Sequence, residues 1–327
     1  MSFSHSLSWA QFFLKGKGLT LCVVGFTLLV LCVNSWTELP VSSIQRRFLR
    51  RCAEASGTET TSTEANSIEA NSTEASDPTL WQPKIGIKWQ IQLEDAVEDV
   101  AMGADIFDID MFDNTAAKIS EIHNKGAKVI CYFSAGTYED WRRDANKFTE
   151  SDFGSALEDW PGERWLDVNS SNVRTIMQSR LDLAQQKGCD GVDPDNIDGY
   201  GNDSGLDLTE ADSIDYLNFL ASEAHSRGMS IGLKNGGDII PSVIENMQWS
   251  VNEQCAQYDE CDVYAAFTDV GKPVFHIEYV DEIGGNNKLK VRDVTSSQKS
   301  AACNAKSAED FSTVIKNMDL DAWVEYC

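Results

Sequence analysis

Basic residues are scarce in this 327-residue chain: 27 lysines and arginines stand against 52 aspartates and glutamates, which gives a formal net charge of -25. A nucleic-acid-binding protein needs clustered lysine and arginine to neutralise phosphates, so this composition argues against that class. The excess of negative charge would instead attract a cationic partner. Residues 1–78 carry only 6 basic and 7 acidic residues, so nearly all of the net charge belongs to the rest of the chain.

Motifs that bind metals or nucleotides are also missing from the sequence. No Cys-x-x-Cys occurs, and no two histidines have the spacing of zinc ligands, which argues against a zinc site. No Gly-x-Gly-x-x-Gly follows the first β-rich run and no Walker motif is present, which disfavours the nucleotide-binding α/β folds. We therefore expect neither a metal nor a cofactor.

One long uncharged run lies near the amino terminus, from Gly18 to Thr37. Its length suits a single membrane-spanning helix, and no small-x-small cleavage signature ends it. We predict an uncleaved signal anchor at 18–37 after a short cytoplasmic segment at 1–17, in preference to a cleaved secretory signal. The protein would then be a single-pass type II protein of the cell membrane with an extracellular carboxyl-terminal domain.

Four arginines follow this run: Arg46, Arg47, Arg50 and Arg51. They oppose the proposed orientation under the positive-inside rule, although large domains are translocated largely regardless of such charges. They also resemble dibasic processing sites, and cleavage there would release the domain. A new amino terminus directly after Arg47 or Arg51 would support release, whereas full-length protein in a culture supernatant would count against it.

Residues 38–78 are interpreted as a disordered stalk rich in serine, threonine and glutamate. Between residues 58 and 76 the sequence Ser-Thr-Glu-Ala-Asn recurs in near-repeats, with Ile68 as the one large apolar residue. Such a segment cannot bury enough apolar surface to offset the entropy of folding. Its hydroxyls suit O-linked sugar, and sequons at Asn71, Asn169 and Asn202 fit a secretory route.

The chain has nine cysteines, of which Cys22 and Cys32 lie in the predicted anchor. The seven that remain are Cys52, Cys131, Cys189, Cys255, Cys261, Cys303 and Cys327. Because seven is odd, at least one has no partner within the chain. The candidate disulfides join Cys255 to Cys261 and Cys303 to Cys327, whereas Cys131 and Cys189 lie in apolar, strand-like runs and are interpreted as buried thiols.

Residues 79–327 alternate between short β-rich runs and helical patterns. The β-rich runs are 84–93, 105–110, 128–134, 165–168, 191–195, 230–235, 248–253 and 273–279. Helical patterns such as 115–125, 173–187 and 208–227 separate them and end at glycines that suit helix caps. This alternation predicts an α/β fold, a (β/α)8 TIM barrel, with a doubly wound open sheet as the alternative.

In a TIM barrel the chemistry lies at the carboxyl ends of the strands. Polar and aromatic residues gather at these positions in the predicted strands: Trp89, Asp110, Tyr132, Asp193, Asp195, Asn196, Lys234, Asn235, Asn252, Glu253, Glu278 and Tyr279. Two carboxylates on different strand ends can cleave a glycosidic bond, because one donates a proton while the other acts as nucleophile or activates water. Aromatic rings beside them can stack on a sugar.

The most concentrated candidate segment is GVDPDNIDGY, from Gly191 to Tyr200. Pro194 favours extended backbone before it, which aims the flanking carboxylates. The offsets of its aspartates break the EF-hand spacing, so a calcium loop is disfavoured, and an ordinary turn rich in Asp and Asn remains the structural alternative. Glu253 is the second candidate acid, with a capping glutamate as its alternative.

Several segments together resemble glycoside hydrolase family 114, in order and without a missing block from about Pro83 to Tyr279. They are 129–137 with Trp141-Arg142, 160–163 with 165–168, 188–196, 232–235 and 252–255. The anchor and stalk also resemble the membrane-tethered fungal endo-α-1,4-galactosaminidases of that family. The resemblance implies a TIM barrel that cleaves internal α-1,4-linked galactosamine in galactosaminogalactan-type polysaccharides.

Carried over residue by residue, the catalytic aspartate of the family falls on Asp195 and its glutamate on Glu253. We expect Asp195 to be the nucleophile and Glu253 the general acid/base, with retention of configuration. The polymer is cationic, so the acidic domain would attract it, and Asp110, Asp193 and Glu278 are the predicted partners of its amines. The other predicted substrate contacts are Trp89, Tyr132, Asn196, Tyr200, Lys234, Asn235, Asn252 and Tyr279. We expect Lys234 to bind a hydroxyl or hold Asp195 ionised, and the protein to be a monomer.

Two other functions remain open at this point. A type II membrane glycosyltransferase shares the anchor and stalk, and Asp108-Ile109-Asp110 matches the Asp-x-Asp that holds a metal and a nucleotide-sugar in many such enzymes. It should also contain a Rossmann-like half, which the sequence does not show. A catalytically inactive barrel that binds cationic polysaccharide is the second alternative.

Overall fold

The computed structural model describes residues 80–100, 103–280 and 294–327. The predicted cytoplasmic segment (1–17), the anchor (18–37), the stalk (38–78) and the arginines at 46–51 lie outside the described residues. Within the described ranges, no helix has both the length and the apolar character needed to span a bilayer.

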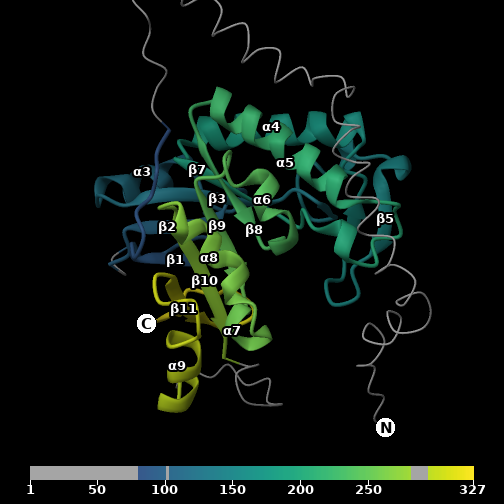
Figure 1. Cartoon of the computed structure of the whole chain (residues 1–327). Coiled ribbons are helices and arrows are strands. Elements are labelled where there is room, and N and C mark those ends of the chain that lie inside the picture. The colour runs from purple at the N-terminus through teal and green to yellow at the C-terminus, as the bar shows by residue number, and fades with distance from the viewer. Residues whose placement is uncertain (1–79, 101–102, 281–293) are drawn as a thin grey trace, which may run out of the picture. The chain divides into compact units, whose positions relative to one another are not determined.

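Nine strands form one curled sheet in the order β1-β2-β3-β7-β8-β9-β10-β11-β12 (Figure 1). The first eight pair in parallel, and β12 pairs antiparallel with β11. Their bounds are β1 Trp89–Gln92, β2 Ile106–Asp110, β3 Lys128–Ser134, β7 Gly191–Asp195, β8 Ser230–Lys234, β9 Trp249–Glu253, β10 Val274–Tyr279, β11 Ser312–Lys316 and β12 Glu325–Tyr326. The strand order follows the chain without the reversal of a doubly wound sheet, which is consistent with an α/β barrel.

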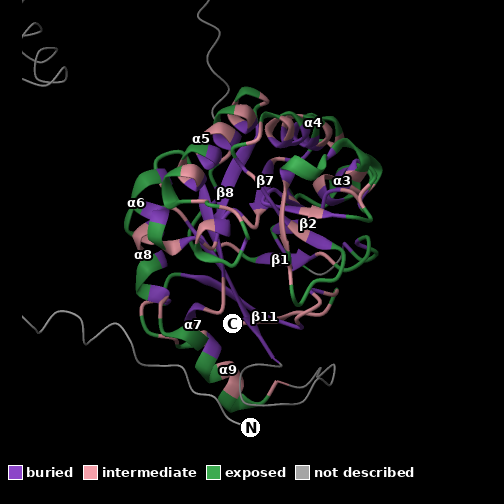
Figure 2. Ribbon diagram, turned by 90° about the vertical axis from the view of Figure 1, so that its right-hand side faces the viewer, coloured by how far each residue is buried: buried purple, intermediate pink, exposed green. Residues whose placement is uncertain are grey.

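Helices cover the outer face of this sheet, with their buried sides turned toward it (Figure 2). They are α3 Ala116–Asn124, α4 Ser171–Lys187, α5 Glu210–Ser226, α6 Ile240–Val243, α7 Cys255–Tyr258, α8 Cys261–Asp269 and α9 Ser296–Cys303, with 3-10 helices η1 Ala145–Lys147, η2 Glu150–Asp152, η3 Gly199–Gly201 and η4 Gly237–Ile239. Local sequence sets their ends. The Ser170 side chain accepts hydrogen bonds from the N–H groups of Asn172 and Val173 in the first turn of α4, and Gly188, at φ 90°, ends that helix as predicted.

The sheet separates two apolar clusters, because alternate residues of each strand face opposite sides. Val129 and Cys131 of β3 pack with the helices in the outer cluster. Ile130 instead joins Trp249 and Phe275 in an inner cluster, built mostly from strand residues. The inward positions nearest the carboxyl ends carry polar side chains, and these form the candidate site.

The predicted fourth barrel strand at 165–168 is wrong. Strand β6 (Glu163–Leu166) belongs to a separate antiparallel sheet, where it pairs with β4 (Thr137–Glu139) and β5 (Phe153–Ala156). The main sheet passes directly from β3 to β7. Its eighth parallel strand is β11, a five-residue run that the sequence analysis missed.

The first and last parallel strands approach each other. The Trp89 Nε1 group donates to the carbonyl oxygen of Ser312 at 2.7 Å, and Ser312 Oγ donates to the carbonyl oxygen of Ile87 at 2.7 Å. These contacts use side chains, and no backbone ladder joins the described strands β1 and β11. The curl of the sheet therefore brings its two ends into contact.

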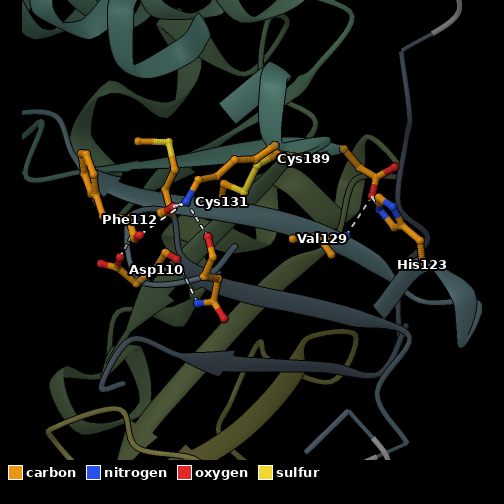
Figure 3. The surroundings of a disulfide bond; sticks show 10 residues. Asp110, Phe112, His123, Val129, Cys131 and Cys189 are labelled. Carbon is orange, nitrogen blue, oxygen red and sulfur yellow. Dashed lines mark hydrogen bonds and ion pairs between the residues drawn. A yellow bond between two sulfur atoms is a disulfide. The ribbon is translucent and has the colours of Figure 1, made fainter. Parts of the chain in front are cut away.

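Three disulfides connect the described cysteines. Cys255–Cys261 and Cys303–Cys327 form as predicted. Interpreting Cys131 and Cys189 as buried thiols was wrong, because they form a disulfide with a Cα–Cα distance of 5.9 Å (Figure 3). Cys131 lies on the outward face of β3, and Cys189 lies two residues before the start of β7, the neighbour of β3 in the sheet.

Gly136 allows the backbone to approach the end of β7 closely. Its N–H donates to the carbonyl oxygen of Asp195 at 3.0 Å, and a Cβ there would lie 1.6 Å from the carbonyl oxygen of Asn196. We expect Gly136→Ala to lower the free energy of unfolding by roughly 1–3 kcal/mol or more. Gly201→Ala is the control, because nothing lies within 4 Å of its added Cβ. Equal unfolding midpoints of the two variants in denaturant would contradict this packing.

Candidate active site

A cleft of about 790 Å³ is lined by residues from the carboxyl ends of the parallel strands. Asp110 ends β2, Asp195 ends β7 and Glu253 ends β9, and all three line the cleft. Its lining includes twelve aspartates and glutamates but only two cationic residues, Arg142 and Lys234. The charge imbalance of the chain is thus concentrated where a ligand would bind.

A single ammonium group joins the two predicted catalytic acids. Lys234 Nζ lies 3.2 Å from Asp195 Oδ1 and 3.4 Å from Glu253 Oε2. Two oxygens bonded to one nitrogen cannot be farther apart than the sum of these distances. This maximum separation of the two oxygens is well below about 9.5 Å, the largest distance between the carboxyl groups of inverting glycosidases. Both acids are therefore within reach of one glycosidic linkage.

Each acid also receives hydrogen bonds from other side chains. Tyr132 donates its hydroxyl to Asp195 Oδ2 at 2.8 Å, and Tyr279 donates its hydroxyl to Glu253 Oε1. Asn235 donates Nδ2–H to Glu253 Oε2 at 2.9 Å and accepts the Glu253 N–H at 3.0 Å. The orientations of both carboxylates are therefore fixed before any substrate enters.

The residues that directly follow β7, β8 and β9 have a left-handed backbone. Asn196, Asn235 and Gln254 have φ values of 60°, 51° and 67°. Non-glycine residues rarely adopt this conformation, and such strain concentrates at functional sites. The abrupt turns keep Asp195, Lys234 and Glu253 as the last residues of their strands.

The electrostatic balance keeps Glu253 charged. Burial alone would raise the pKa of Glu253, but the Lys234 ammonium and the hydrogen bonds from Tyr279 and Asn235 hold it below its usual value. Burial alone would lower the pKa of Lys234, but Asp195, Glu253 and two deeper carboxyls raise it well above its usual value. Lys234 is therefore a permanent cation that stabilises negative charge on both acids.

Those two deeper carboxyls, Asp108 and Asp193, form a fully buried pair inside the sheet. Apart from each other, they have no hydrogen-bond partner among the described residues. Burial raises the pKa of Asp193 to about 7, and burial and the neighbouring Asp193 raise that of Asp108 well above its usual value. The pair therefore retains a shared proton at acid pH.

Two further acids in the cleft were not predicted as site residues. Glu163 accepts a hydrogen bond from Thr137 Oγ1 at 2.7 Å, and burial, with Glu139 and Asp195 nearby, raises its pKa to about 7. Burial and the charge of Asp195 raise the pKa of Asp198 to about 6. Both lie inside segments that the sequence analysis singled out, at positions 160–163 and 191–200, so their location was available as a signal.

Besides the buried Asp193, four of the predicted substrate contacts do not line the cleft. Trp89 begins β1, at the opposite end of the sheet, and its buried ring stacks on Phe275 at 4.9 Å. Tyr200, in η3, packs against the outer cluster. Asn252 and Glu278 fill outward positions of their strands, where Asn252 accepts the Cys255 N–H and Glu278 bonds to His276. The structure therefore does not bring these four residues to the cleft, and Asn252 and Glu278 lie on the opposite face of their strands from the cleft.

Three other predicted contacts are engaged by protein groups. Arg142 binds both oxygens of Asp110, at 3.2 and 2.6 Å. Asp193 is fully buried, so neither aspartate offers a free carboxylate to a substrate amine. The Asn196 amide, although it lines the cleft, donates to Ser134 Oγ and Thr137 Oγ1.

Two side-chain groups in the described part of the chain have the spacing of metal ligands: Cys255, Cys261 and His276, and Glu94, Asp319 and Asp321. In the first group the cysteines form a disulfide, so no thiolate is free to bind a metal. Asp108 and Asp110, which a glycosyltransferase would use for its metal, are held in the buried acid pair and in the ion pair with Arg142. These contacts count against the glycosyltransferase alternative.

The family model of glycoside hydrolase family GH114 matches residues 70–327. The crystal structure of Ega3 from Aspergillus fumigatus, in complex with galactosamine, has 64% sequence identity and a TM-score of 0.72, over 76% of this chain and 97% of that chain. The glycoside hydrolase domain of PelA from Pseudomonas aeruginosa has 13% identity and a TM-score of 0.55, over 73% and 98% of the two chains, a likeness of fold alone. No curated protein sequence matches this chain.

Replacing Asp193 by Asn tests the shared proton of the buried pair. Because the folded-state pKa of Asp193, about 7, lies above the ordinary 3.8, its proton stabilises the fold below about pH 4, and this contribution is lost as the pH rises to about 7. One such proton contributes a slope of up to about 1.4 kcal/mol per pH unit. The measurement is the free energy of unfolding, obtained in denaturant at several pH values between 4 and 8. We expect this free energy to change less with pH in Asp193→Asn than in the wild type, and the exposed control Asp182→Asn to match the wild type. Parallel curves for all three proteins would count against the pair.

Proposed function

The chain belongs to glycoside hydrolase family GH114, and on that premise we propose that it hydrolyses internal α-1,4-galactosamine linkages in a cationic polysaccharide of the galactosaminogalactan type. Two observations support this substrate. Ega3, at 64% identity, is described in complex with galactosamine. The cleft lining is strongly acidic, which complements a polymer of ammonium sugars.

The observation that carries the proposal is the placement of Asp195 and Glu253 on one ammonium, Lys234. Asp195 attacks the anomeric carbon while Glu253 gives its proton to the departing glycosidic oxygen, so the bond between the sugars breaks and an ester to Asp195 forms. Glu253 then takes a proton from water, whose oxygen displaces Asp195 from the same carbon. Two inversions retain the configuration. Because Lys234 holds the pKa of Glu253 low, the free protein carries this proton only in acid.

The proposal extends to the whole chain. The curled sheet would close as a (β/α)8 TIM barrel, supported by its eight parallel strands in sequential order and by the contacts of Trp89 with Ser312. Residues 18–37 would anchor a glycosylated type II protein of the cell membrane through the stalk at 38–78, unless processing near Arg46–Arg51 releases it. The catalytic domain would be extracellular and monomeric.

Single substitutions of the two acids test the function. We expect Asp195→Asn and Glu253→Gln to lower the rate of polymer cleavage by roughly 10³-fold, because each removes one carboxyl of the pair. Asp182→Asn, which changes an exposed acid bonded to Arg227, should leave the rate unchanged. The measurement is the size distribution of products from partly deacetylated polygalactosamine. If the wild type and both variants bind this polymer equally well and the wild type never shortens it, the protein is instead an inactive binding barrel.

Azide separates the two roles. With an activated aryl glycoside of a galactosamine oligomer, Glu253→Ala plus azide should give a glycosyl azide of retained configuration, because azide attacks the ester on Asp195. Asp195→Ala plus azide should give the inverted product by direct attack. The anomeric coupling in NMR spectra gives the configuration of each glycosyl azide. If Glu253→Ala gives the inverted product and Asp195→Ala the retained one, Glu253 is the nucleophile and Asp195 the general acid/base.

A further inference from the structure

Two tryptophans of the cleft are exposed to solvent and lie on the small antiparallel sheet. Trp141 is 54% and Trp160 is 52% exposed, and both line the cleft that contains Asp195 and Glu253. Neither ring has an aromatic partner among the described residues. Leaving large apolar rings in water forgoes about 2 kcal/mol of burial each, so paired exposure in a cleft points to a ligand.

The two tryptophans occupy neighbouring turns. Trp141 follows β4, and Trp160 lies in the turn between β5 and β6. The Asp140 N–H donates to the carbonyl oxygen of Gly162 at 3.1 Å, which joins the two turns. A Cβ on Gly162 would lie 3.0 Å from the Trp141 ring, so the absence of a side chain there lets this ring lie against the neighbouring turn.

The support beneath these turns is rigid. Arg142, the residue after Trp141, is held by Asp110 of β2 and by Glu139 of β4, with its shortest contacts at 2.6 and 2.7 Å. Behind the turns, the Tyr138 ring packs on Phe153 at 4.7 Å. The ion pair that makes Asp110 unavailable to a substrate amine thus fixes the small sheet to the main one.

Carboxylates accompany the rings. Glu158 and Asp159 directly precede Trp160, are exposed and line the same cleft. No ion pair involving either is present among the described residues. A hexosamine offers an apolar ring face for stacking and an ammonium group for a carboxylate, which matches this combination.

We propose that Trp141 and Trp160, with Glu158 and Asp159, form a distal aminosugar subsite that holds one arm of the polysaccharide chain while Asp195 and Glu253 cleave it elsewhere in the cleft. The inference rests on the proposed function, because it assigns a further contact to the same substrate. The rings supply affinity for any sugar of the chain, and the two carboxylates supply the preference for a deacetylated one.

The test compares long and short substrates. Trp141→Ala and Trp160→Ala should each lower kcat/KM for deacetylated polygalactosamine by roughly tenfold, the effect of losing about 1.4 kcal/mol of stacking. For the shortest oligomer that the wild type cleaves, kcat/KM should change less than twofold. Tyr258→Ala, which removes a ring that is 60% exposed and outside the cleft, is the matched control and should behave as the wild type on both.

The carboxylates are tested by acetylation and salt. The double variant Glu158→Gln/Asp159→Asn should lose affinity for the deacetylated polymer severalfold at low salt, converge with the wild type at 1 M salt, and bind the acetylated polymer unchanged. Equal losses of the tryptophan variants on long and short substrates, or none on the long one, would overturn the subsite. A wild type that cleaves neither substrate would overturn the proposed function, whereas binding losses in the Asp195→Asn background would still report on the subsite.

Discussion

The site depends on one buried ammonium group that binds two carboxylates from different strands. Lys234 is 2% exposed, and its Nζ contacts both Asp195 and Glu253. Without that cation, two acids this close in a buried site could not both be charged, and one would retain a proton. The lysine reaches both acids because the parallel register aligns the end of β8 with β7 on one side and β9 on the other. The fold thus fixes the spacing, and the ammonium fixes the charge.

The acidic residues around Lys234 have different roles according to how deeply they are buried. The deepest acids, Asp108 and Asp193, have raised pKa values, so at acid pH they are protonated and add little charge. Asp110 and Glu139 are paired with Arg142 and hold the small sheet in place. Other acids of the lining are more exposed and give the cleft its attraction for cations. A count of acidic residues in the sequence cannot separate these roles, because burial and partners decide which carboxylate stays free.

Much of the fold and part of the site were predictable from the sequence. Asp195 and Glu253 end β-rich runs that the structure confirms as parallel strands, so their convergence followed from the architecture. Asn252 and Glu278 lie on the outer faces of their strands, a position that the alternation of apolar residues in those strands already indicates. The Cys131–Cys189 disulfide could not be predicted, because it requires β3 to neighbour β7 across an inserted antiparallel sheet. Strand β11 was missed, although it is as long as the run at 191–195 that was predicted.

The most direct test of the shared ammonium is the pH profile of kcat/KM for Lys234→Met on galactosamine polymer. We expect a loss of at least about a hundredfold, because the charge and orientation of both acids depend on the lysine. We also expect the remaining activity to extend to higher pH, since Glu253 without the ammonium keeps its proton to a higher pH. A folded Lys234→Met protein with near wild-type kcat/KM and an unshifted profile would contradict the account.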